Sequence, residues 1–317
     1  MQELIKKYNI SEEFYKRFFR FNGEMNYAIK LQDFILFKRG TFLNPVKKLQ
    51  YIEQFVEDEI KNFYEKGEIN ISKIDFDVTT RCTLKCKNCT NLMPLFNSSN
   101  HIDYSMEDIQ NDLERLFSVV NRIHLVQIIG GESLINPKLA DILEYCAKQE
   151  KIGTIKIITN GTVVPSARVI EVIKKYNQKI YFYISNYSNN PDLQPLLKHE
   201  KIIELLKANQ IKVQRAEAMT WFEELPLGLK NYDEQQLKNM FKSCIMKSCI
   251  SLLNHKIHIC AKSASGYELG LIDAHDFIDL NSDTLRQDII DFYNREYFDA
   301  CKYCVRTNKE VLPAEQL

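Results

Sequence analysis

The sequence predicts an α/β protein built around a mostly parallel sheet or a partial barrel. From residue 73 onward, short apolar runs alternate with segments whose apolar residues recur at helical spacing, and this βαβα alternation is typical of parallel sheets and barrels. The apolar runs contain few polar residues, as expected of strands that are buried on both faces. Five strands are expected at residues 74–78, 123–129, 154–159, 180–185 and 211–214, with helices between them at residues 106–119, 138–149, 166–176 and 193–208.

A sixth strand could lie within residues 219–229, although Pro226 and Gly228 argue against a long one. These strands and helices define a first expected unit, residues 73–230. A second unit, residues 231–317, loses the alternation and holds five of the nine cysteines, which predicts a small cysteine-rich α+β module.

Residues 1–72 form a third expected unit, a mostly helical N-terminal extension. Ser11 followed by two acidic residues is typical of a helix start, and residues 51–64 carry apolar side chains at helical spacing. Residues 26–31 fit a strand and a helix equally well.

The composition bounds the class of protein. The chain has 317 residues, and its 42 Lys and Arg balance its 42 Asp and Glu, so it has no electrostatic footprint for nucleic acid. No apolar run approaches the length of a membrane span, so no membrane partner is expected. The N-terminus does not resemble a signal peptide, and nine cysteines in that context indicate a reducing cytoplasm and metal binding.

Three cysteines follow the first expected strand with a tight spacing, Cys82-x3-Cys86-x2-Cys89. Thiolates are the usual ligands of a [4Fe–4S] cluster, and three of them leave one iron open to a small molecule, much as a catalytic zinc keeps an open position. Two alternatives stay open, because buried free cysteines are common and cysteines also bind zinc, although structural zinc normally takes four protein ligands.

This cysteine loop resembles that of the radical S-adenosylmethionine (SAM) superfamily. The resemblance implies a TIM-like partial barrel of five to six βα units, (β/α)5-6, in which the open iron is chelated by the amino and carboxylate groups of SAM. Reductive cleavage of SAM, with an electron from a donor such as flavodoxin or ferredoxin, then gives a 5′-deoxyadenosyl radical that abstracts hydrogen from a substrate. Asn88 departs from the family, which often has an aromatic residue there near the adenine, so we expect that contact to come from the backbone or from Leu92.

Residues at the ends of the next three strands resemble the SAM contacts of the family. Gly130-Gly131-Glu132 is similar to the Gly-Gly-Glu motif that binds the methionyl amino group. Asn160 and Ser185 are similar to sites where polar side chains contact the ribose or carboxylate of SAM. Ordinary turn chemistry explains Asn160 and Ser185 equally well.

The C-terminal cysteines form a second pattern, Cys244-x15-Cys260-x40-Cys301-x2-Cys304, around an expected hairpin with its turn at Asn254-His255. The pattern resembles the twitch and SPASM modules of radical SAM enzymes, which implies a second, auxiliary [4Fe–4S] cluster. A zinc site is the alternative. Cys249 could replace Cys244 as a ligand, donate a hydrogen atom to a substrate radical, or simply be buried.

Together the two patterns predict a radical SAM oxidoreductase that dehydrogenates or epimerises a polar small molecule, such as a carbohydrate, with the auxiliary cluster as electron acceptor. Arg215 and Glu217, which follow the fifth expected strand, are candidates for the catalytic base, and a surface salt bridge is the alternative for both. A maturase of ribosomal peptides and a non-enzymatic zinc or iron–sulfur scaffold are the competing interpretations.

Overall fold

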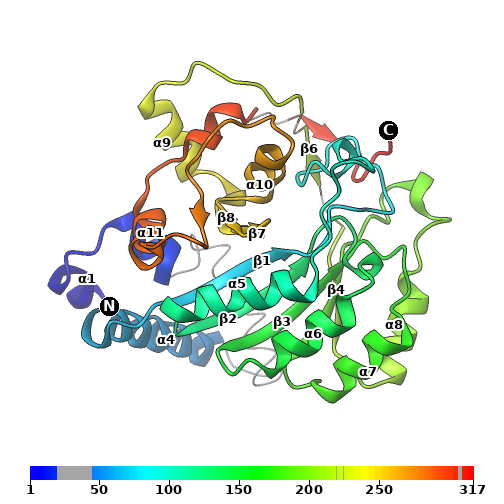
Figure 1. Cartoon of the computed structure of the whole chain (residues 1–317), viewed down its shortest axis with the longest axis horizontal. Coiled ribbons are helices and arrows are strands. Elements are labelled where there is room, and N and C mark those ends of the chain that lie inside the picture. The colour runs from blue at the N-terminus through cyan, green and yellow to red at the C-terminus, as the bar shows by residue number, and fades with distance from the viewer. Residues whose placement is uncertain (20–44, 219, 224, 306–308) are drawn as a thin grey trace.

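The computed structural model describes residues 1–19, 45–218, 220–223, 225–305 and 309–317. An eight-stranded sheet with the order β5-β4-β3-β2-β1-β7-β8-β9 lies at its centre (Figure 1). Its first five strands are parallel neighbours in chain order, which confirms the predicted α/β class. They are β1 (Asn70–Asp77), β2 (Arg122–Ile129), β3 (Ile152–Thr159), β4 (Ile180–Ile184) and β5 (Val213–Arg215).

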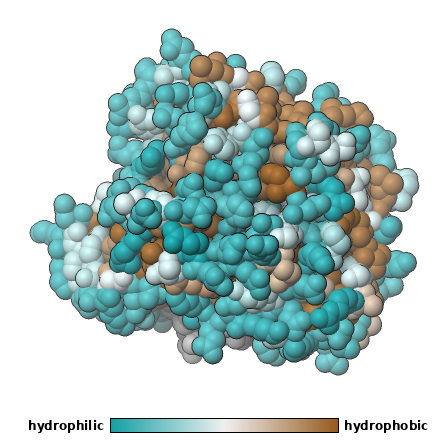
Figure 2. All heavy atoms as spheres, viewed as in Figure 1, coloured by the Kyte–Doolittle hydropathy of each residue, from teal (hydrophilic) through white to brown (hydrophobic). Residues whose placement is uncertain are grey.

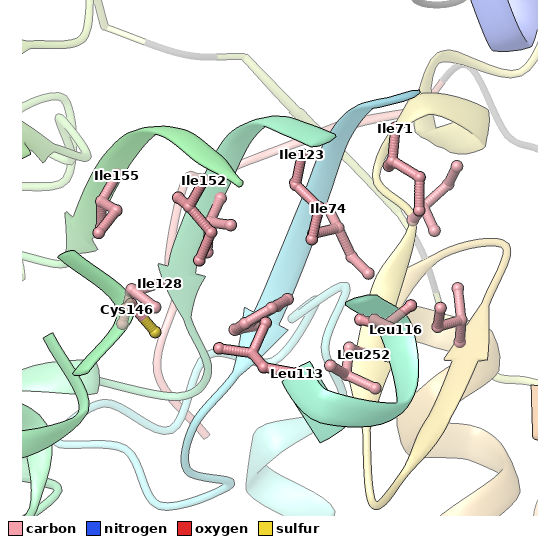
Figure 3. Close-up of a cluster of buried hydrophobic side chains, with 14 of the residues drawn as sticks. Ile71, Ile74, Leu113, Leu116, Ile123, Ile128, Cys146, Ile152, Ile155 and Leu252 are labelled. Atoms are coloured by element: carbon pink, nitrogen blue, oxygen red, sulfur yellow. The ribbon is translucent and has the colours of Figure 1, made fainter. Parts of the chain in front are cut away.

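Four helices connect these strands: α5 (Met106–Val119), α6 (Leu139–Lys148), α7 (Ala167–Lys175) and α8 (His199–Ala208). The helix expected from residue 193 begins only at His199, because Pro191–Leu193 forms a separate 3₁₀ turn capped by the Asn190 side chain. Apolar side chains of the sheet, among them Ile74 and Ile128, pack against these helices (Figure 3). Each fully buried Ile or Leu side chain stabilises the fold by roughly 1.5–3 kcal/mol.

The opposite face of the sheet changes character along the strands. At the amino-terminal ends it carries Ile71 and its register partner Ile123. Toward the carboxyl ends the buried side chains become polar, and Asp75, Gln127 and Lys156 lie in register on three neighbouring strands. Asp75 accepts hydrogen bonds from Lys73 Nζ at 3.0 Å and from Gln127 Nε2 at 2.7 Å. Because buried charges are costly unless paired, this polar half marks the functional end of the sheet.

The sheet continues into the C-terminal part of the chain through β7, which pairs in parallel with β1. Asn254 and His255 form the turn that follows β7, with left-handed φ values of 49° and 62°, which confirms the predicted hairpin. The sixth strand considered within residues 219–229 is present as the short β6, but it lies outside the parallel sheet and forms a separate antiparallel ribbon with β10. The strands are β6 (Trp221–Phe222), β7 (Ser251–Leu253), β8 (Lys256–His258), β9 (Ile278–Asp279) and β10 (Glu310–Val311).

The rest of the C-terminal part is mostly helical, with α9 (Glu234–Lys242), α10 (Ala261–Glu268), α11 (Leu285–Asn294) and short 3₁₀ helices at Ile245–Ser248 and Asp299–Tyr303. The boundary expected near residue 230 lies within residues 225–233, which carry no helix or strand. The division of the chain into three units stays a prediction, because β7 joins the C-terminal part to the central sheet.

The N-terminal extension packs against the C-terminal part (Figure 1). Its described elements are α1 (Gln2–Lys7), α2 (Glu12–Phe14), a π-helical turn (Tyr15–Phe19) and α4 (Pro45–Lys66), and the Ser11 side chain caps α2 as expected. The buried Arg17 guanidinium donates hydrogen bonds to the carbonyl oxygens of Phe292, Tyr293 and Arg295. Residues 26–31 lie outside the described residues.

Figure 2 shows a mostly hydrophilic face, with apolar side chains gathered in its upper half. Among the described helices, none is both long enough and apolar enough to cross a membrane.

Candidate functional site

The three clustered cysteines lie in the loop that follows β1. Burial raises the pKa of Cys82 to about 11 and that of Cys86 to about 12, and it also raises the pKa of Cys89. The neighbouring thiols contribute to the shifts of Cys82 and Cys86, so the sulfur atoms lie within electrostatic reach of one another. Without iron the three groups are neutral thiols, and metal binding would release their protons.

Two of the sulfur atoms accept hydrogen bonds from nitrogen donors. Cys82 Sγ accepts from the Leu84 N–H at 3.4 Å and from Asn160 Nδ2 at 3.6 Å, and Cys86 Sγ accepts from Gln316 Nε2 at 3.5 Å. Three clustered thiols, two of them with N–H donors aimed at their sulfurs, are a donor set that fits a [4Fe–4S] cluster. In the described part of the chain, no three Cys, His, Asp or Glu side chains are grouped so as to share a single metal ion.

The Gly-Gly-Glu loop lies directly against the backbone that leads into Cys82. Gly131 N–H donates to the Thr79 carbonyl at 2.8 Å, and Glu132 N–H donates to the Arg81 carbonyl at 2.9 Å. A Cβ atom on Gly130 would lie 2.2 Å from Thr79 O, and one on Gly131 would lie 2.1 Å from Arg81 O. Glycine is therefore required here for a close backbone-to-backbone contact.

Glu132 is fully buried and joins the ends of β2 and β3. Its carboxylate accepts hydrogen bonds from Thr159 Oγ1 at 2.9 Å and from the backbone N–H groups of Asn160 at 2.8 Å and Leu134 at 3.1 Å. Burial raises the pKa of Glu132 to about 7. In this structure the carboxylate holds the carboxyl end of β3 in place. A contact between Glu132 and the ammonium group of SAM stays a prediction.

Asn160 and Ser185 lie on the same side of the sheet as the cysteine loop. Asn160 Nδ2 also donates to Thr83 Oγ1 at 3.0 Å, so it contacts the loop twice. Ser185 hydrogen-bonds the buried hydroxyl of Tyr187, whose pKa is raised by burial and, to a smaller extent, by the three nearby cysteine thiols. Tyr187 makes an edge-to-face contact with Trp221 at a centroid distance of 5.6 Å. No local pattern singles out Tyr187, because its contacts depend on tertiary structure.

The C-terminal cysteines meet at a cavity of about 320 Å³ whose lining includes Cys244, Cys260, Cys301 and Cys304. Burial raises the pKa of Cys260 well above its usual value and that of Cys301 to about 12, and the other cavity thiols add to both shifts. Cys249 is not among the described lining residues. The structure therefore brings together the four cysteines of the predicted auxiliary site. Cys244 lines the cavity, whereas Cys249, the alternative ligand, does not belong to the described lining.

The candidate bases Arg215 and Glu217 lie at the surface. Arg215 lies in register with Ile184, whose side chain belongs to the helix-side core, and its guanidinium forms an exposed ion pair with Glu200 of α8 at 2.7 Å. Glu217 is exposed. Arg215 thus makes the surface salt bridge that was its alternative interpretation. Cys146, on α6, is fully buried in the hydrophobic core.

Asp77, the last residue of β1, is a further candidate that the sequence did not reveal. It is fully buried, Oδ1 accepts a hydrogen bond from Asn91 Nδ2 at 3.2 Å, and Oδ2 has no hydrogen bond of good geometry. Burial, together with the charge of Asp75, raises the pKa of Asp77 to about 8. Its position at the carboxyl end of β1 was a signal that could have found it.

Comparison with known families agrees with this geometry. Residues 76–244, more than half of the chain, match the family model described as the radical SAM superfamily. The chain therefore belongs to the radical SAM superfamily, whose members use a [4Fe–4S] cluster and SAM.

Several curated relatives match over part of the chain. The antilisterial bacteriocin subtilosin biosynthesis protein AlbA of Bacillus subtilis is 32% identical over 127 residues, which cover 40% of this chain and 26% of AlbA. The GTP 3′,8-cyclase of Syntrophomonas wolfei is 29% identical over 101 residues, which cover 31% of this chain and 30% of the cyclase. The chain thus matches only about a quarter to a third of the length of these relatives.

Several solved structures are also similar. BtrN in complex with AdoMet and 2-DOIA has a TM-score of 0.47 and 16% identity, covering 78% of this chain and 98% of BtrN. The anSMEcpe protein with bound AdoMet has a TM-score of 0.49 and 13% identity, covering 72% of this chain and 82% of that protein.

Proposed function

We propose that this protein is a radical SAM oxidoreductase with two [4Fe–4S] sites, which removes hydrogen from a carbon atom of a polar small molecule. The observation that carries the proposal is the convergence of four cysteines on one cavity, in addition to the three in the loop after β1. Cys82, Cys86 and Cys89 would hold the first cluster and leave one iron open for SAM. Cys244, Cys260, Cys301 and Cys304 would hold the second, with no open iron, which suits an electron carrier.

When bound, the first cluster and SAM supply the 5′-deoxyadenosyl radical. In a dehydrogenation the substrate would lose one hydrogen atom to this radical, one proton to a base and one electron to the second cluster. Asp77 is the base that we propose, in place of Arg215 and Glu217. With a pKa of about 8, Asp77 is mostly protonated at neutral pH, and its ionised fraction is the form that would take the proton, as a stronger acceptor than an ordinary carboxylate.

The proposed partners are a small-molecule substrate and a one-electron donor such as flavodoxin or ferredoxin, in the cytoplasm. All nine cysteines are free of disulfide bonds, which agrees with a reducing compartment. In an epimerisation, the variant of this reaction, Cys249 would return a hydrogen atom to the substrate.

Peptide modification is the second candidate function. It is favoured by the match to AlbA, which is named as a protein of bacteriocin biosynthesis. The genes beside this one would separate the two candidates, since a short precursor peptide supports a maturase and sugar-modifying genes support a small-molecule enzyme.

Iron and sulfide content after anaerobic reconstitution tests the two-site proposal. The wild-type protein should hold about eight irons, and a Cys82→Ala/Cys86→Ala/Cys89→Ala variant about four, because each thiolate-held [4Fe–4S] cluster contributes four. The four irons that stay bound to the variant would also show that it is folded. A wild-type protein with about four irons and zinc in the second site would remove the electron acceptor and favour a redox-neutral reaction.

A further inference from the structure

Residues 310–317, here called the strap, connect the β6–β10 ribbon to the cysteine loop. After β10 pairs with β6, the strap crosses to residues 85–87 and pairs with them in antiparallel fashion around Cys86 and Gln316. Lys87 N–H donates to the Glu315 carbonyl at 2.7 Å, and Leu317 N–H donates to the Lys85 carbonyl at 2.9 Å. The loop that carries the first three cysteines is thus bonded to a segment more than two hundred residues away in sequence.

The side chain of Gln316 makes three hydrogen bonds at this contact. Its Oε1 accepts from the Lys85 backbone N–H at 2.7 Å, while its Nε2 donates to the Ala314 carbonyl at 2.6 Å and to Cys86 Sγ at 3.5 Å. The orientation of the amide is determined, because the Lys85 N–H requires an acceptor and the Ala314 carbonyl requires a donor. The NH2 group therefore lies on the side of the Cys86 sulfur.

The strap is anchored by packing as well as by these hydrogen bonds. Ala314 is fully buried, with a left-handed φ of 51°, in a cluster with Leu84, Cys86 and Leu193. Asn190 Nδ2 donates to the Pro313 carbonyl at 2.9 Å. Gln316 is consequently held in place from both the strap and the loop.

We propose that Gln316 is a positioning residue for the SAM-binding cluster, which orders residues 85–87 and raises the reduction potential of the cluster through its hydrogen bond to Cys86. This inference rests on the proposed role of Cys86 as a ligand. Reduction adds negative charge to the cluster and its sulfur ligands, and an N–H donor stabilises that charge. The donor therefore favours the reduced state.

Two substitutions separate the donor from the acceptor. Gln316→Glu keeps an oxygen for the Lys85 N–H but replaces the donor by a negative charge, whereas Gln316→Leu removes both groups at similar volume. In an EPR-monitored redox titration without SAM, the potential of the first cluster should become more negative in Gln316→Leu and still more negative in Gln316→Glu. Hydrogen exchange of the Lys85 amide should accelerate several-fold in Gln316→Leu and less in Gln316→Glu, because Gln316→Glu retains its acceptor.

Leu317→Ala is the matched control, since that side chain is 73% exposed and its backbone hydrogen bond is unaffected. It should keep the wild-type potential. If Gln316→Leu fails to hold the cluster while Gln316→Glu holds it at a lower potential, both parts of the proposal are supported. Wild-type potentials in both Gln316 variants would overturn it. A wild-type protein without the first cluster would instead overturn the ligand role of Cys86, and with it the premise of the strap proposal.

Discussion

The two cysteine sites differ in how the chain builds them. In the first, three thiols come from a single loop, residues 82–89, and distant segments only shape it, namely the Gly-Gly-Glu loop and the strap. In the second, the thiols come from separate segments around α9, the hairpin and the last 3₁₀ helix, so the site exists only when that part of the chain is folded. The first site is encoded by local spacing and the second by tertiary structure.

The polarity of the surroundings differs between the two sites, and the difference agrees with the roles proposed for them. Buried polar groups lie beside the first site, including Glu132, Asn160 and Asp77. The cavity of the second site is lined largely by apolar side chains, such as Phe241 and Ile259, along with its four thiols. A polar site with an open iron suits bond cleavage, whereas a site with four thiol ligands and no open iron suits electron transfer.

The largest effect that would sharpen this comparison is expected from Cys301→Ser. We predict that this variant loses the second cluster, so that iron falls from about eight to about four per chain, because a ligand from a remote segment is removed. The first cluster should persist, and SAM supplied with dithionite should still give 5′-deoxyadenosine. Iron analysis and chromatography of the products measure both quantities.

Cys249→Ser is the control for this experiment, because Cys249 lies next to the site in sequence but outside the described cavity lining. It should retain about eight irons. If Cys249→Ser loses the second cluster and Cys244→Ser does not, the ligand assignment is reversed. If Cys301→Ser abolishes both clusters, the two sites are not independent and the comparison fails.

A smaller effect, on the shape of the first site, is expected from Gly131→Ala. The added methyl group would lie 2.1 Å from the Arg81 carbonyl oxygen, and backbone cannot move aside as a flexible side chain can. We expect a loss of roughly 3 kcal/mol in the free energy of unfolding, together with weaker retention of the first cluster. Denaturant unfolding and iron release to a chelator would measure these effects.

Gly228→Ala provides the matched control, since a Cβ there has no atom within 4 Å. Its stability should change by no more than about 0.5 kcal/mol. Equal stability and equal iron retention in the two variants would show that the Gly-Gly-Glu loop does not pack as tightly against the cysteine loop as the structure indicates.

Local patterns explain which parts of this molecule the sequence predicts. The five parallel strands are apolar runs with turn residues at their ends, and the Cys82-x3-Cys86-x2-Cys89 spacing lies within one loop. The hairpin at Asn254-His255 was also predictable, because both residue types tolerate left-handed φ values. Each of these features depends on residues that are close in sequence.

Features that join distant segments were not predictable in the same way. Strand β7 has only three residues, so nothing in its own pattern indicates that it pairs with β1. Gln316 and Cys86 are 230 residues apart in the sequence, and no motif marks their contact. The pairing of Arg215 with Glu200 of α8 is likewise a tertiary contact between a strand and a neighbouring helix, which no local pattern of the fifth strand indicates.

The smallest expected effect, taken per unit of pH, concerns Asp77, which lies beside the first site. Its pKa is raised from 3.8 to about 8 in the folded protein, so the folded state keeps a proton that the unfolded state has lost above pH 4. The unfolded state then binds fewer protons, and stability falls as pH rises from about 4 to about 8. We predict that Asp77→Asn removes this contribution and flattens the slope by up to about 1.4 kcal/mol per pH unit.

Urea unfolding of the iron-free protein between pH 5 and pH 8 (a range inside the window of about 4 to about 8) would measure this slope. Asp283→Asn is a suitable control, because Asp283 is exposed and its substitution should leave the slope unchanged. Lys73 and Asp75 face the same region, and their ion pair is present in both variants, so it does not account for a difference between them. Parallel slopes in wild type and Asp77→Asn would mean that Asp77 is ionised in the folded state at neutral pH. A carboxylate that had already lost its proton at that pH would hold a transferred proton weakly, and Asp77 would then lose its advantage over other groups as the proposed base.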